Sequence, residues 1–152
     1  MFNLRPTCAA LLLSLAITLP LHAQNNKTQI EQIVQVISHT YDQANNKVQT
    51  APVVVQGDYA IASWRQGEKG GRALLKRQSG QTGQWEILLC AGSGLRQEAG
   101  LIAAGIAPAL AKQLAAQLKQ AEQSLPAEQI ARFDSFDSKL TPHHASSSAK
   151  HH

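Results

Sequence analysis

Cys90 is the residue with the most evident chemistry in this sequence. We expect it at the end of a strand, beside the turn Gly92-Ser93-Gly94, where a helix start could lower its pKa and favour the thiolate. A thiolate is a ligand for soft transition metals, although one thiolate alone does not make a site. The alternative is a buried cysteine that packs as a small apolar side chain, which Leu88 on the same strand favours.

Histidines form two pairs near the C-terminus. His143 and His144 are followed by a Ser-rich stretch and then by His151 and His152. Paired imidazoles on a flexible tail could chelate Cu(II), Ni(II) or Zn(II) with modest affinity, because ordering such a tail costs entropy. The alternative is a polar tail with no role of its own. His39 is isolated, and we expect it on the solvated side of a helix.

The two tryptophans are Trp64 and Trp85. We expect them on neighbouring strands, where they could face one another in the core. The alternative is that they form the aromatic wall of a small cleft between the sheet and the helices.

Catalytic motifs in the sequence are incomplete. The stretch around Ser93 resembles a nucleophile elbow but lacks the glycine two places after the serine. Residues 67–71 place Lys69 among glycines without the pattern of a phosphate-binding loop, and we expect a hairpin connection there. Asp134 and Asp137 are explained by capping of a helix end. We therefore expect no catalytic residues and a protein that is not an enzyme.

The first 23 residues have the order of a secretory signal peptide. An apolar run at residues 8–19 is followed by the small residue Ala23, after which we expect cleavage. The run is shorter than the roughly 20 residues of a membrane span, although an uncleaved anchor is the alternative. We expect a soluble periplasmic protein with no membrane span after cleavage. Because Cys8 leaves with the signal peptide, Cys90 has no partner for an internal disulfide.

The composition argues against a nucleic-acid partner. The chain has 152 residues, of which 43% are hydrophobic, as expected for one globular core. Its 14 Lys and Arg give a net charge of +4, but they are scattered, and aromatic residues make up only 5%. A nucleic-acid surface needs clustered cations and aromatic platforms.

Local patterns place secondary structure in the order helix, strands, helices. Thr28 and Glu31 have the spacing of a capping box, and apolar residues at helical spacing follow them until Asn45. Strands are expected at 53–55, 59–64, 72–77 and 85–90, because these runs are β-branched, aromatic or apolar and are separated by turn residues. Helices are expected at 95–104, from Pro108 to about 124, and after Pro126.

This order predicts an α+β protein. The N-terminal helix should precede an antiparallel meander of three to four strands, and the C-terminal helices should pack on one face, so that the helices gather on one side of a small sheet. We expect a single α+β domain over residues 24–138. Residues 139–152 should form a disordered Ser/His-rich tail.

Three stretches of the expected sheet resemble the copper uptake system-associated protein family. They are 57–64 (GDYAIASW), 70–77 (GGRALLKR) and 84–92 (QWEILLCAG), and the similarity continues to 133–136 (FDSF). This resemblance implies an exported accessory of bacterial copper uptake that binds copper weakly or docks on a copper transport component of the envelope. The terminal histidines depart from the family pattern. A protein-interaction module without its own metal site is the alternative.

Overall fold

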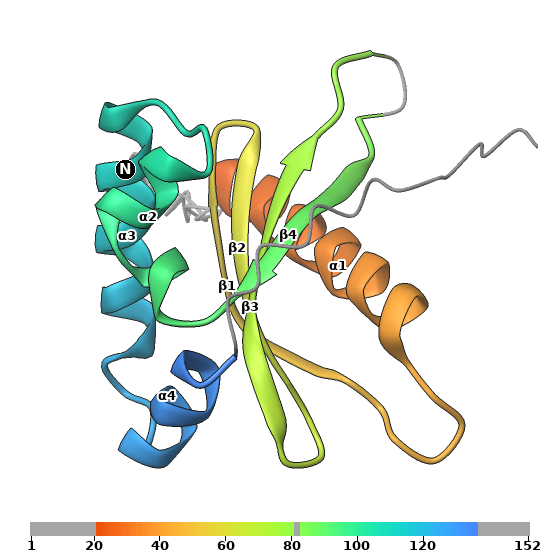
Figure 1. Ribbon diagram of the computed structural model, residues 1–152. Helices are drawn as coiled ribbons and strands as arrows, with labels where there is room; N and C mark the ends of the chain where they lie inside the picture. Colours follow the sequence, from red (N-terminus) through yellow and green to blue (C-terminus); the bar gives the residue numbers. More distant parts are fainter. Residues whose placement is uncertain (1–20, 81–82, 137–152) are drawn as a thin grey trace, which may run out of the picture.

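The computed structural model describes residues 21–80 and 83–136, and Figure 1 shows the arrangement of the elements. Residues 1–20, which include most of the expected signal peptide, and the tail at 139–152 lie outside the described residues. The elements in chain order are α1 (Leu21–Tyr41), β1 (Gln49–Gln56), β2 (Tyr59–Gln66), β3 (Lys69–Arg77), β4 (Trp85–Ala91), the 3-10 helix η1 (Ser93–Arg96), α2 (Glu98–Ala103), α3 (Pro108–Glu122) and α4 (Ala127–Asp134).

The strands form one antiparallel sheet in the order β1-β2-β3-β4, so the prediction of an α+β fold built on a meander is confirmed. The register of β2 and β3 pairs Tyr59 with Lys76 at one end and Gln66 with Lys69 at the other. The turn between them is formed by Gly67, whose φ of +58° is readily adopted only by glycine, and Glu68. The short connections therefore fix strand order.

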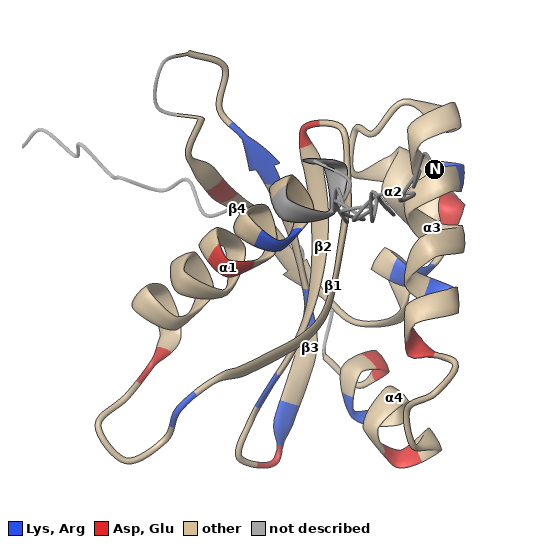
Figure 2. Ribbon diagram, turned by 180° about the vertical axis from the view of Figure 1, so that it is seen from behind, with Lys and Arg blue, Asp and Glu red and all other residues tan. Residues whose placement is uncertain are grey.

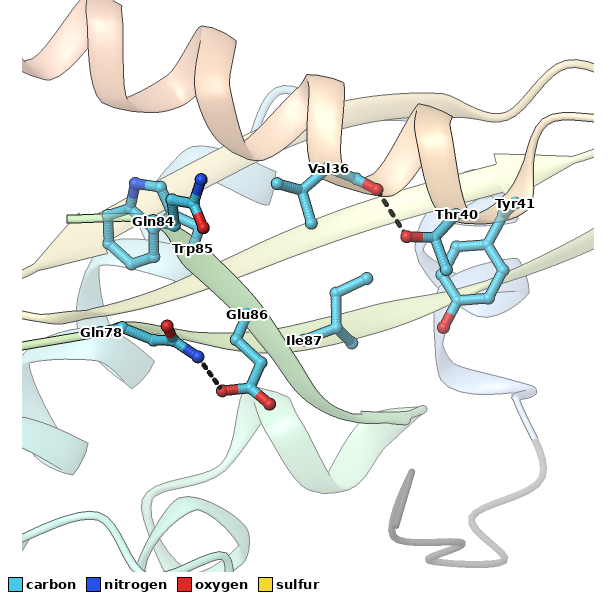
Figure 3. A pocket seen from close by; sticks show the side chains of 8 residues that line it. All are labelled: Val36, Thr40, Tyr41, Gln78, Gln84, Trp85, Glu86 and Ile87. Carbon is cyan, nitrogen blue, oxygen red and sulfur yellow. Dashed lines mark hydrogen bonds between the residues drawn. The ribbon is translucent and has the colours of Figure 1, made fainter. Parts of the chain in front are cut away.

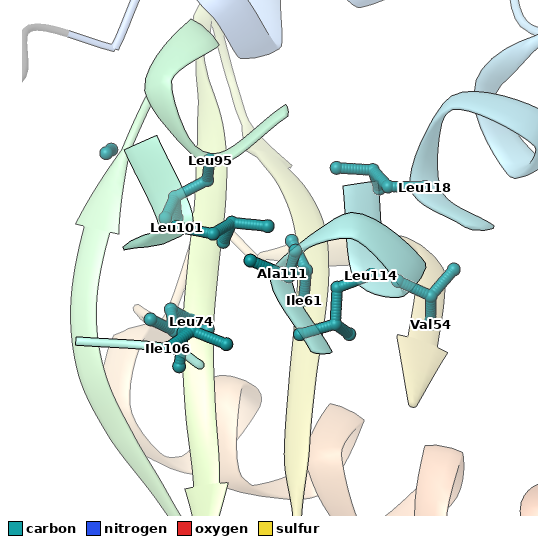
Figure 4. Packing of buried hydrophobic residues seen from close by; sticks show 10 residues of the cluster. Val54, Ile61, Leu74, Leu95, Leu101, Ile106, Ala111, Leu114 and Leu118 are labelled. Carbon is teal, nitrogen blue, oxygen red and sulfur yellow. The ribbon is translucent and has the colours of Figure 1, made fainter. Parts of the chain in front are cut away.

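Both faces of the sheet are covered by helices. On β3, Leu74 packs with residues of α2 and α3, whereas Leu75 belongs to a second cluster with residues of α1. Figure 1 shows α1 on the opposite side of the sheet from α2, α3 and α4, and Figure 4 shows the cluster beneath α3. The expectation that all helices gather on one side is therefore wrong for α1. The physical reason is that β2 and β3 are apolar on both faces, and both must be removed from water.

The helix boundaries agree with the sequence pattern at the C-terminal side and differ at the N-terminal side. The three expected helices after the sheet are confirmed as α2, α3 and α4, with Leu95 in η1. α1 begins at Leu21 instead of Thr28 and ends at Tyr41 instead of Asn45. After it, the Asp42 side chain accepts a hydrogen bond from the amide of Val48 at 2.8 Å and so closes a tight loop. No helix in the described ranges has both the length and the apolar character to span a membrane.

Candidate functional site

Cys90 lies near the C-terminal end of β4 and is half-buried on the face covered by α1. Its Sγ is 3.7 Å from the phenol oxygen of Tyr41 at the end of α1. The Tyr41 ring stacks on Trp64 of β2 with 6.4 Å between ring centroids, and Phe136 meets Trp64 edge-on at 5.4 Å. Elements far apart in the sequence thus enclose the thiol in aromatic side chains.

Gly71 creates the space for this cluster, whereas a Cβ on its neighbour Gly70 would meet Arg132 on the other face of the sheet. Gly71 pairs with Trp64 across the strands, and a Cβ placed on it would lie 2.9 Å from Cγ of Phe136. Gly70 pairs with Arg65 in the same ladder. The sequence assigned both glycines to the hairpin connection, but only Gly67 serves the turn. Gly70 and Gly71 are buried strand residues, and the absence of their side chains leaves room for Arg132 and Phe136, respectively.

The environment of Cys90 favours the neutral thiol. Burial raises its pKa, and this effect outweighs the hydrogen-bonding contacts of Tyr41 and Trp64, which lower it. Although Trp64 acts on the sulfur in this way, its indole N–H makes no hydrogen bond of good geometry and the side chain is only 9% exposed. Of the two interpretations of Cys90 from the sequence, the raised pKa therefore favours the buried cysteine over the helix-activated thiolate, because desolvation dominates at this position.

The sequence also named histidines as metal ligands. His143, His144, His151 and His152 lie outside the described residues. Within residues 21–80 and 83–136 no three His, Cys, Asp or Glu side chains are grouped closely enough to hold a metal ion. Cys90 is thus the one expected ligand whose surroundings the structure describes.

A groove runs between α1 and the start of β4, and Figure 3 shows the residues of one part of it. It consists of two adjoining hollows of about 370 and 760 Å³ that share Val36, Thr40, Gln84 and Trp85. Gln32, Gln35 and Gln78 add side-chain amides and Glu86 adds a carboxylate. His39, which is exposed as expected, lines the larger hollow. The groove therefore combines amide and hydroxyl groups and one carboxylate with the apolar side chains of Val36, Trp85 and Ile87.

The two tryptophans do not form one wall. Trp64 pairs with Gly71 and Trp85 with Arg77, which places them six residues apart along β3, or about 20 Å at 3.3 Å per residue. β3 also separates their strands, so they are not neighbours. Trp85 alone lines the groove, with 5% of its surface exposed and its indole N–H without a partner. The two tryptophans neither lie on paired strands nor lie close to each other, so the hypothesis that together they form one wall of a cleft is wrong.

A buried network of charged side chains on the other face was missed by the sequence reasoning. Arg72 of β3 donates to both carboxylate oxygens of Glu122, at 2.8 and 3.0 Å, and to Asp134 at 2.7 Å. Arg96 adds an ion pair to Glu122 at 3.1 Å, and the hydroxyl of Ser63 donates to Glu122 at 3.1 Å. Arg72 and Glu122 are both fully buried. The network links β2, β3, η1, α3 and α4.

Periodicity carries the signal that could have found this network. Arg72 has the same strand parity as the core residue Leu74, and Glu122 continues the buried stripe of Leu114 and Leu118 by one helical turn. Two opposite charges at core positions predict a buried pair, because each would otherwise be desolvated without compensation. Asp134 was expected to cap a helix, but its carboxylate binds Arg72 instead.

Comparisons with known proteins identify no family for this chain. No family model matches it, and neither a curated protein nor a solved structure shows significant similarity.

Proposed function

We propose that this protein is an exported, non-enzymatic accessory of bacterial copper uptake that binds copper weakly through Cys90 and passes it to a copper transport component of the envelope. The proposal depends on one observation, which is the resemblance of residues 57–64, 70–77 and 84–92 to the copper uptake system-associated proteins. These stretches include the whole of β4 and most of β2 and β3, and so the strand positions of Trp64 and Cys90.

The surroundings of Cys90 suit a soft monovalent cation as cargo. A buried thiolate is unfavourable because it is charged, whereas a thiolate that has exchanged its proton for Cu(I) is neutral overall. The hydroxyl of Tyr41 lies 3.7 Å from the sulfur and can donate to it, and such a contact stabilises the electron density of a thiolate ligand. Because the pKa of Cys90 is raised, protons compete strongly with the metal. Affinity should therefore be low and should rise with pH.

One sulfur leaves the coordination of copper incomplete. The remaining ligands would come from a partner protein or from the paired histidines of the tail, with His143 and His144 closer in sequence to α4 than His151 and His152. A ligand set completed by a partner favours transfer over storage. This is the sense in which we regard the protein as an accessory of a transport system.

The test is a Cu(I) titration of protein recovered from the periplasm of cells that express the full chain. Against a colorimetric Cu(I) competitor, we expect one copper per chain, a decrease in tryptophan emission because Trp64 lies beside the sulfur, and tighter binding at higher pH. Cys90→Ser should abolish binding, whereas a chain truncated after Ser138 should keep it. Tyr41→Phe, which retains the thiol, serves as the matched control and should weaken binding only modestly.

The opposite results discriminate between versions of the proposal. If only the truncation removes binding, the tail histidines hold the metal and the assignment of Cys90 is wrong. If neither Cu(I) nor Cu(II) alters emission or melting temperature, direct binding is excluded and docking alone remains. Docking is then excluded in turn if the protein captures no copper transport component from solubilised envelope.

A second candidate function is a protein-interaction module without a metal site. The observation that favours it is the groove between α1 and β4, lined by Val36, Thr40 and Trp85. Crosslinking in envelope extract with chelator present separates the two functions. A partner retained under chelation and lost when Thr40 is replaced by Arg supports the interaction module, whereas a partner released by chelator supports copper handling.

A further inference from the structure

A polar pocket lies at the end of the sheet away from the groove, where β2 meets the loop after α1. Its volume is about 420 Å³, and it is lined by Asn45, Asn46, Lys47, Gln49, Arg65, Gly67 and Arg132. The loop that forms one wall is held in place by several contacts. The side-chain amide of Gln66 donates to the backbone carbonyls of Tyr41 and Asn46, both at 2.8 Å. The backbone groups of Gln43 and Asn46 bond to each other. The pocket is therefore preformed.

Three cationic side chains from three separate elements line this pocket. Lys47 comes from the loop, Arg65 from β2 and Arg132 from α4. In Figure 2, blue segments on the loop, the strands and α4 lie toward the same end of the molecule. Like charges brought together in this way repel one another unless an anion compensates them.

The acidic groups nearby compensate only part of this charge. Lys47 is 3.5 Å from Asp42, and Arg132 is 3.9 Å from Glu68, whose side chain is almost fully exposed. Exposed ion pairs of this kind contribute little and are easily exchanged. Among the described residues Arg65 has no acidic partner within 4.0 Å.

The backbone places the two arginines next to each other. Arg65 pairs with Gly70 across β2 and β3. A Cβ on Gly70 would lie 2.9 Å from Cγ of Arg132, so the stem of Arg132 rests on this glycine. Arg132 lies on α4. Arg65 lies on the sheet face that α3 and α4 cover, because it has the strand parity of Ser63, which contacts Glu122 of α3. The missing side chain of Gly70 thus allows two guanidinium groups to share one pocket.

We propose that this pocket binds a phosphate group, free or as a monoester. Guanidinium groups present several donors in a fixed fork that matches phosphate oxygens, and Lys47 adds a mobile point charge. Cations that approach from a loop, a strand and a helix suit the oxygens of a tetrahedral anion better than those of a planar carboxylate. The inference does not depend on copper, because none of these residues contacts Cys90.

The experiment is calorimetric titration of the full chain at constant ionic strength with three probes: inorganic phosphate, glycerol 3-phosphate and vesicles of phosphatidylcholine with phosphatidic acid. We expect one saturable site per chain that weakens as chloride is raised. Arg65→Gln should weaken binding at least about tenfold, since a charge-assisted hydrogen bond is lost. Gly70→Ala should weaken it as well, by displacing Arg132 without removing charge.

Controls and probes decide the outcome. Lys112→Gln removes one charge from the exposed surface of α3 and should leave binding unchanged. Binding of a soluble probe that Arg65→Gln weakens supports a free phosphate ligand, and binding confined to vesicles with the same dependence supports a lipid headgroup. The proposal is overturned if no probe binds, or if Lys112→Gln weakens binding as much as Arg65→Gln does. Circular dichroism of each variant confirms that it is folded.

Discussion

The two faces of the sheet differ in whether their buried polar groups have hydrogen-bond partners. On the face covered by α3 and α4, the fully buried Arg72 and Glu122 are paired with each other and with Asp134, Arg96 and Ser63. On the face covered by α1, the indole N–H groups of the two tryptophans are buried without hydrogen-bond partners. A groove also opens beside α1, and the thiol of Cys90 is only half-buried.

This difference indicates that the two layers have different roles. A network whose donors and acceptors are satisfied fixes one arrangement of η1, α3 and α4 on the sheet, because any other arrangement leaves charges unpaired. Unpartnered donors and an open groove are features of a surface that can still accept a ligand. We therefore regard the charge network beneath α3 and α4 as the scaffold and the α1 face as the side that carries the groove and Cys90.

The largest expected effect comes from breaking the network. Glu122→Gln removes the charge that neutralises Arg72 and Arg96, and we expect the free energy of unfolding to fall by about 3 to 5 kcal/mol in urea titrations. The exposed Glu128 provides the matched control, since Glu128→Gln removes the same charge from α4 and should change stability by less than about 0.5 kcal/mol. Equal losses in the two variants would contradict the structural role of the network.

A double variant sharpens the same comparison. Arg72→Met with Glu122→Leu replaces the pair by apolar side chains of similar size, and such replacements of buried pairs are often neutral. We expect it to unfold at a higher urea concentration than Glu122→Gln. A double variant less stable than the single one would indicate that Asp134 and Arg96, left without their buried partners, dominate the cost.

The local part of the fold could be predicted from the sequence, whereas the layering could not. Turn glycines and β-branched runs specify the meander, and helix formers after Gly94 specify the C-terminal helices, because these are properties of neighbouring residues. The position of α1 depends on residues such as Ala60 and Ala62, which are fully buried by α1. Small residues in a strand do not indicate by themselves which element covers them.

The candidate site was predictable only in part, for a related reason. Cys90 could be named from its residue type, but its neighbours Tyr41 and Trp64 come from two other segments, and Phe136, which packs on Trp64, comes from a third. The sign of its pKa shift depends on burial by those segments, which spacing along the chain does not report. The pairing of Trp64 with Trp85 failed because β3 lies between their strands and because they pair with residues six positions apart along it.

The second expected effect is a loss of stability at alkaline pH that originates on the α1 face. The pKa of Cys90 is raised in the folded state, so above the ordinary pKa of a thiol the unfolded chain has lost a proton that the folded chain still binds. The stabilisation is complete below that ordinary pKa and is lost as pH rises toward the raised value. In this window stability should fall by up to about 1.4 kcal/mol per pH unit.

Comparison with Cys90→Ser isolates this contribution. The variant replaces the thiol by a slightly smaller hydroxyl that does not titrate in this range. Whatever its effect at neutral pH, its stability should fall less steeply between pH 8.5 and pH 10 than that of the wild type, by roughly the slope given by proton linkage. Thermal denaturation at several pH values measures the difference. Parallel curves for the two proteins would mean that the folded thiol titrates normally and that burial does not control it.

The smallest expected effect compares two adjacent residues of β2 that face opposite layers. Ser63→Ala deletes a satisfied donor on the scaffold side, and we expect a loss of about 1 kcal/mol because its hydrogen bond to Glu122 disappears. Trp64→Phe leaves a small void but also removes an N–H that has no hydrogen bond of good geometry. These two terms oppose each other, so the net change measured in urea should be smaller than that of Ser63→Ala, although the variant deletes more atoms. A larger loss in Trp64→Phe would mean that the indole N–H contributes a real hydrogen bond to the sulfur of Cys90, and the contrast between the two faces would then depend on Trp85 and Thr50 instead of Trp64.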